Sequence, residues 1–225
     1  MASDDQLTLF DLIGRSWADD EAQAVVSDYD GLKAIRLDTG GIYDFRGSGV
    51  KFFAGKTDDG NEIGEIYIYD PEHRVYEHQR LAKMPCDLRI GQTQERTRAL
   101  LGEPYDAHIG HTYPPPRIPG VICALPRRES GWDCYHSSQL IERLKIHPLK
   151  PFLLTIEYPL GWGGLKQIRD AEEKILLIVP EHQRVGKMVL RLWESALPNR
   201  CGLRSVDAIL ERDARRRSII EGWDM

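Results

Sequence analysis

The chain has 225 residues, a net charge of −5 and 41% hydrophobic residues, with a mean hydropathy of −0.43. This balance is typical of a soluble globular protein and excludes a fibrous repeat or a largely disordered chain. No apolar run approaches the roughly 18 residues that span a bilayer, and the acidic start MASDDQ lacks the basic region of a signal peptide. We therefore expect a cytoplasmic protein without a membrane partner.

The charge is distributed unevenly along the chain. Residues 1–70 hold 15 acidic and 6 basic residues, whereas residues 71–225 hold 20 acidic and 24 basic ones. An acidic segment repels nucleic acid and attracts basic surfaces, although acidic residues also serve simply as a solvated face. The one arginine cluster, Arg212–Arg217, is diluted by neighbouring acids, so we expect no nucleic-acid partner.

The first third of the chain predicts two helices and then strands. Apolar residues at helical spacing predict a short helix over 9–13 and a second helix from Trp17 to Tyr29, capped at Ser16 and ending before Gly31. Beyond Gly31 the sequence is strand-like. Thr57–Asn61 contains Asp-Gly and predicts a hairpin turn, followed by a strand with Ile66 and Ile68 on one face and Tyr67 and Tyr69 on the other.

The remaining elements are read from caps, glycines and apolar periodicity. Thr93 is a good N-cap for a helix that ends at Gly102. A Pro-rich connection occupies 105–130. The other expected elements are an extended segment over 76–85, strands over 132–136, 152–158 and 174–179, a turn beginning at 161–164, a helix over 185–193 and a last helix from Ser205.

Together these elements predict an α+β protein with an antiparallel sheet and peripheral helices. The Pro-rich connection is a natural place to divide the chain into two unequal lobes. We therefore predict an N-terminal α+β lobe over 1–104 and a C-terminal lobe over 105–225 that begins with the Pro-rich connection and has a helical end.

Residues that could carry chemistry are sparse. The four cysteines include no Cys-x-x-Cys pair, and His73 and His78 lie at an odd spacing that places them on opposite faces of a strand, so we expect no metal site. Cys134 and His136 are two residues apart on one predicted strand, so they share a face and could both point inward. This leaves a Cys/His-dependent hydrolase or transferase as an alternative. The sequence otherwise predicts no catalytic residue and no cofactor, and hence a protein that is not an enzyme.

Several short motifs resemble immunity proteins of bacterial polymorphic toxin systems. They are Leu88–Thr93 leading into Leu100–Pro104, then Trp132-Asp133-x-Tyr135 and Ile156–Tyr158, preceded by Gly49–Phe52 and Ile66–Tyr69. The same order is also similar to small sheet modules of outer-membrane assembly lipoproteins, but the N-terminus lacks a lipobox cysteine. The resemblance to immunity proteins implies a cognate toxin as the partner and supplies no specific binding residues.

The leading hypothesis is therefore a cytoplasmic immunity protein that occludes the active site of a toxin. Charge complementarity would steer the association, and the acidic N-terminal part suggests the residues of the electrostatic face. These are Asp19, Asp20, Glu21, Asp58, Asp59 and Glu62. A scaffold module of a secretion or envelope complex is a further alternative.

Overall fold

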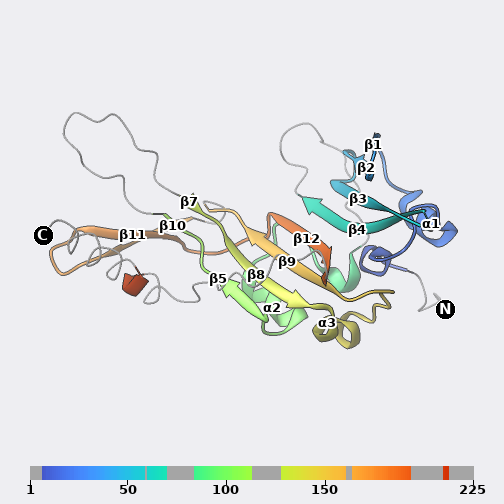
Figure 1. Cartoon of the computed structure of the whole chain (residues 1–225). Coiled ribbons are helices and arrows are strands. Elements are labelled where there is room, and N and C mark those ends of the chain that lie inside the picture. The colour runs from blue at the N-terminus through green and yellow to red at the C-terminus, as the bar shows by residue number, and fades with distance from the viewer. Residues whose placement is uncertain are drawn as a thin grey trace, which may run out of the picture.

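The computed structural model describes residues 7–58, 60–69, 84–112, 128–160, 164–193 and 210–212. Figure 1 shows a large antiparallel sheet with a smaller sheet extending from one end. In spatial order the large sheet consists of β1 (Leu32–Leu37), β2 (Gly40–Phe45), β3 (Val50–Thr57), β4 (Gly60–Tyr69), β12 (Lys187–Leu192), β9 (Phe152–Tyr158), β8 (Gly131–His136) and β5 (Asp106–His108).

The smaller sheet continues the larger one rather than standing apart. Its order is β10 (Leu165–Arg169), β11 (Ile175–Pro180), β6 (His111–Thr112) and β7 (Arg128–Glu129). The helices are η1 (Leu9–Leu12), α1 (Asp20–Val26), η2 (Pro85–Asp87), α2 (Gln94–Leu101) and α3 (Ser137–Leu144). The α+β class with antiparallel sheet and peripheral helices is thus confirmed. Strands from both sides of residue 104 pair within the large sheet, where β4 neighbours β12.

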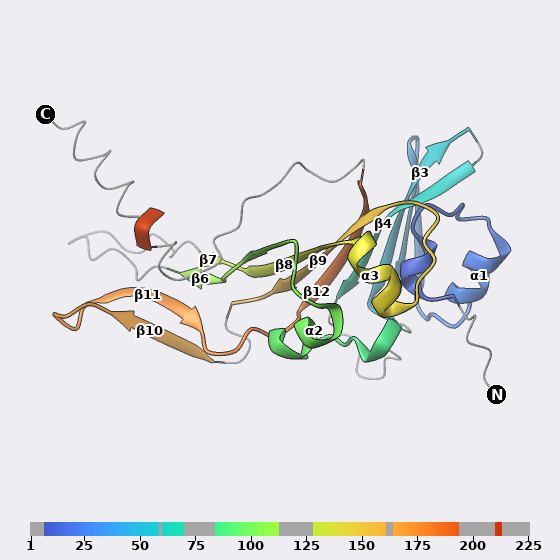
Figure 2. The same ribbon diagram turned by 90° about the horizontal axis from the view of Figure 1, so that it is seen from below.

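One face of the large sheet carries the main core. Phe52, Ile66, Leu154 and Met188 are fully buried there, in one cluster with apolar residues of the helices, and Figure 2 shows α2 and α3 on the same side of the strands. In β4 and β9 the alternating residues, such as Tyr67, lie on the opposite face and are only partly buried. This confirms the predicted alternation after the Asp-Gly hairpin, because an antiparallel sheet commonly packs on one face only.

Local caps account for the helices. The Thr93 hydroxyl accepts the Arg96 backbone N–H at 3.4 Å, and Gly102 ends α2 with a φ of +86°, as predicted. The second helix is shorter than predicted and begins after Asp19, whose carboxylate accepts the Glu21 N–H at 2.9 Å. Trp17 is not helical, because its N–H donates to the Asn61 carbonyl at the start of β4.

The predicted helix over 185–193 is wrong. Residues 187–192 form β12, which pairs with β4 on one side and β9 on the other. Met188, Val189 and Leu190 are consecutive and all buried. A strand in the centre of a sheet can bury side chains on both faces, so its apolar run imitates a helical stripe.

Other expectations fall wholly or partly outside the described residues. These are most of the extended segment over 76–85, the centre of the Pro-rich connection, residues 161–163 of the turn and most of the helix from Ser205, of which 210–212 are described and helical. The strand β10 was not predicted. It is an exposed strand that pairs with β11, so its side chains carry little of the apolar alternation by which half-buried strands are recognised.

Candidate functional site

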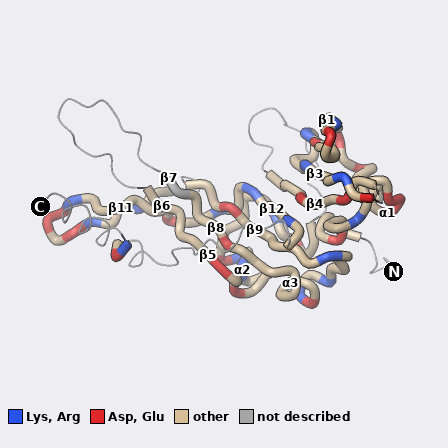
Figure 3. Tube along the Cα trace, viewed as in Figure 1, with Lys and Arg blue, Asp and Glu red and all other residues tan. Residues whose placement is uncertain are grey.

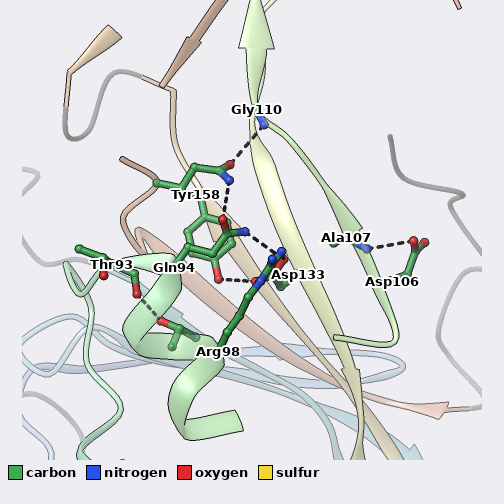
Figure 4. Close-up of polar contacts among 10 residues, drawn as sticks. Thr93, Gln94, Arg98, Asp106, Ala107, Gly110, Asp133 and Tyr158 are labelled. Carbon is green, nitrogen blue, oxygen red and sulfur yellow. Dashed lines mark hydrogen bonds and ion pairs between the residues drawn. The ribbon is translucent and has the colours of Figure 1, made fainter. Parts of the chain in front are cut away.

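The most concentrated group of polar contacts surrounds Asp133, which is 0% exposed. Asp133 lies on the core face of β8, and Figure 4 shows side chains from α2 and β9 converging on it. A buried carboxylate is costly unless it is paired and hydrogen-bonded. The surrounding residues must therefore supply several donors.

Four hydrogen bonds reach the Asp133 carboxylate. Arg98 of α2 donates from Nε at 2.9 Å and from a terminal nitrogen at 2.6 Å. The Tyr158 hydroxyl of β9 donates at 2.8 Å, and the Gln94 side-chain amide donates at 3.1 Å. Since a carboxylate offers about four acceptor sites, these bonds use its full capacity. The group ties α2 to β8 and β9.

A second amide extends this network to the junction of the two sheets. Gln183 donates from its side chain to Gln94 Oε1 at 2.8 Å and accepts the Gly110 N–H at 3.3 Å. Gly110 links β5 to β6, and Gln183 precedes β12, so both positions lie where the chain passes between the sheets. The Asp133 network therefore also fixes this junction.

The network also shifts the pKa values of residues around Asp133. The pKa of Arg98 is raised, mainly by its hydrogen bond to Asp133, and burial followed by the nearby Asp133 charge raises the pKa of Tyr158. Burial and the same carboxylate also raise the pKa of Tyr135. With its acceptor sites occupied by these donors, Asp133 is positioned to anchor α2 to the sheet.

Gly131 provides a test of the junction. A Cβ at this position would lie 1.8 Å from Gln183 Oε1 and 2.9 Å from the Gly110 nitrogen. We expect Gly131→Ala to displace the Gln183 amide and lower the free energy of unfolding by about 1–3 kcal/mol, the usual cost of overpacking. Denaturant unfolding measures this, with Gly55→Ala as the matched control, because a Cβ there meets nothing within 4 Å. Equal stabilities of the two variants would contradict the expectation.

Cys134 and His136 share a face of β8, as expected from their spacing, but this is not the core face, so the inward orientation considered for the Cys/His alternative is not found. Both are only partly buried and alternate with the buried Asp133 and Tyr135. Burial raises the pKa of the Cys134 thiol, which lowers its thiolate fraction and its nucleophilicity. The His136 Nδ1 lies 2.8 Å from the Ser138 hydroxyl and caps α3. These contacts describe a packed thiol and a helix cap.

The two segments that carry the described acidic residues of the predicted set lie side by side at the end of the molecule that carries α1. Ser16 pairs with Glu62 in an isolated bridge, which places the start of α1 beside the β3–β4 hairpin (Figure 3). Arg15 contacts Asp19 at 3.4 Å and Glu21 at 2.5 Å. Lys150 contacts Glu62 at 2.7 Å, so two cations pair with three of the carboxylates and leave one net negative charge among them.

Two further acids of this set keep their charge available. Asp20 and Asp58 are exposed, and neither forms an ion pair with any residue that the structure describes. Asp59 lies outside the described residues, as do His73 and His78. We name the five described acids Asp19, Asp20, Glu21, Asp58 and Glu62 the acidic end.

Neither a metal centre nor a membrane span is found among the described ranges. No group of three or more His, Cys, Asp or Glu side chains there is arranged to hold an ion. The described helices are also too short or too polar to cross a bilayer.

The chain was compared with known proteins by family model, by sequence and by structure. A scan against protein-family models, a search of curated proteins and a search of solved structures returned no match to it.

Proposed function

We propose that this protein is a cytoplasmic immunity protein that binds a cognate toxin and occludes its active site. The short motifs that resemble such proteins suggest the class. The observation that carries the proposal is the acidic end, where backbone contacts join two segments about forty residues apart in sequence and each segment carries acidic residues. A negative surface of this kind steers association with a basic partner.

The arrangement of the acidic end supports a binding role in a specific way. Arg15 pairs with Asp19 and Glu21, and Lys150 pairs with Glu62, which holds those side chains in place. Asp20 and Asp58 remain exposed beside them. A partner would thus meet two available carboxylates on a preorganised surface, and preorganisation lowers the entropy cost of binding.

The test has two stages. The tagged chain is used to capture its partner from the native cell, and the captured protein is then expressed in a bacterial host with and without this chain. We expect the partner alone to arrest growth and co-expression to restore it. A partner that leaves growth unaffected, or growth arrest that co-expression does not relieve, would overturn the proposal. Capture of a harmless envelope or secretion protein would instead support the scaffold alternative.

A further inference from the structure

The outer edge of the large sheet is formed by β1, all six residues of which are exposed. Its apolar side chains are unusually open to solvent, with Leu32 at 54%, Ile35 at 42% and Leu37 at 49% exposure. Soluble proteins normally protect an exposed edge strand, because it is a template for pairing with another chain. An edge that is apolar and that no other described strand pairs with suggests a site for strand addition.

The backbone register shows which groups are available on this edge. The Arg46 N–H donates to the Gly31 carbonyl at 3.4 Å, and Leu37 pairs with Gly40 across a two-residue turn. Hydrogen-bonded pairs alternate along an antiparallel ladder. Lys33, Ile35 and Leu37 therefore bond to β2, whereas the N–H and C=O groups of residues 32, 34 and 36 face away from the sheet.

Two cations lie within the same strand. Lys33 and Arg36 are exposed, and no ion pair joins either of them to another described residue. Because they are three residues apart, they project from opposite faces of the strand. Asp30 and Asp38 lie beyond the two ends of β1, so the cations dominate the charge along its centre.

We propose that β1 accepts an extended segment of the toxin as an additional strand, and that this segment carries one carboxylate on each face. The inference rests on the proposed function in naming the toxin as the source of the strand. Main-chain hydrogen bonds from residues 32, 34 and 36 would supply affinity, and side-chain pairing would supply specificity. Carboxylates opposite Lys33 and Arg36 satisfy both cations, and apolar residues opposite Leu32, Ile35 and Leu37 cover the exposed side chains.

The pairing dictates a pattern for the bound segment. Read along an antiparallel partner strand, the residues opposite Leu37 through Leu32 should be apolar, acidic, apolar, unrestricted, acidic and apolar. A second copy of β1 does not fit this pattern, because its central charges are cationic. The occupant that the charges favour is therefore a different, acidic segment.

The test uses end-capped peptides and the full-length chain. Val-Glu-Val-Thr-Glu-Val fits the pattern, and Val-Lys-Val-Thr-Lys-Val has the opposite charge. We expect NMR titration to show tighter binding of the glutamate peptide by about tenfold, because two cross-strand pairs change from attractive to repulsive. Failure of both peptides to bind, or equal binding of the two, would overturn the inference.

Variants identify the edge responsible. Lys33→Glu combined with Arg36→Glu should reverse the preference between the peptides. Ala34→Pro should abolish binding of both, because it removes an outward N–H while leaving the bonds to β2 in place. Lys166→Glu, on the exposed strand β10 of the smaller sheet, should leave binding unchanged.

Three results distinguish this inference from a dimer and from the proposed function. A dimer in analytical ultracentrifugation that Ala34→Pro abolishes would overturn the inference by assigning the edge to a second copy. Growth protection that persists in Ala34→Pro would likewise overturn it and leave the immunity role intact. If the partner proves harmless while the peptides bind as expected, the immunity role fails and strand addition at β1 stands.

Discussion

Arg98→Met is expected to lower the free energy of unfolding by about 3 kcal/mol, because it leaves the fully buried Asp133 carboxylate without its cation. Methionine keeps the length of the side chain but supplies no donor. For a chain of this size the loss corresponds to a fall of roughly 6–12 °C in Tm. Thermal unfolding followed by circular dichroism measures it.

Arg96→Met is the matched control for this substitution. Arg96 lies on the same helix, is exposed and uses its backbone N–H to complete the Thr93 cap, so the change should alter stability by less than about 0.5 kcal/mol. Adding Asp133→Asn to Arg98→Met removes the stranded charge, and the double variant should be more stable than the sum of the single losses implies. Equal Tm values for Arg98→Met and Arg96→Met would show that the ion pair does not stabilise the fold.

Reversing the two available charges of the acidic end should slow toxin binding. We expect Asp20→Lys combined with Asp58→Lys to reduce the association rate constant by about tenfold at low ionic strength, because steering depends on the field between the two surfaces. The loss should shrink as salt is added, since screening weakens that field. Stopped-flow mixing with the captured partner at several salt concentrations measures both effects.

Asp20 and Asp58 are chosen because their substitution should change binding without disturbing the fold. Asp19 caps α1 and Glu62 contacts Lys150, so reversing either of them would also disturb the structure. Glu142→Lys combined with Glu172→Lys makes the same change in net charge at exposed positions of α3 and the β10–β11 turn. Equal slowing by both double variants would mean that net charge alone acts and that the acidic end is not the docking surface.

Local signals predicted the parts of the fold that local interactions determine. The Thr93 cap, Gly102 and the Asp-Gly hairpin each rest on contacts within a few residues, and each appears as expected. The strands β8 and β9 were recognised for a similar reason, since one face of each packs in the core and their residues alternate. The pairing of Glu62 with Ser16, which precedes α1, is a long-range bridge that no local pattern could establish.

The remaining features depend on contacts between distant segments. Asp133 draws its partners from positions 25 to 39 residues away, and nothing near it in the sequence marks it as the centre of a network. The one sequence signal for this network is that Asp133 is an acidic residue on the same strand face as Tyr135. The strand β12 was mistaken for a helix because burial on both faces depends on β4 and β9, which lie far from it in sequence.

The central position of β12 has a consequence for synthesis on the ribosome. The strands β4 and β9 are translated first, but the strand that joins them follows more than a hundred residues after β4. Until residue 192 leaves the exit tunnel, the nascent chain presents two unsatisfied strand edges, which are sites of aggregation. Premature termination before this point should therefore yield insoluble product, and chaperone demand should peak just before β12 emerges.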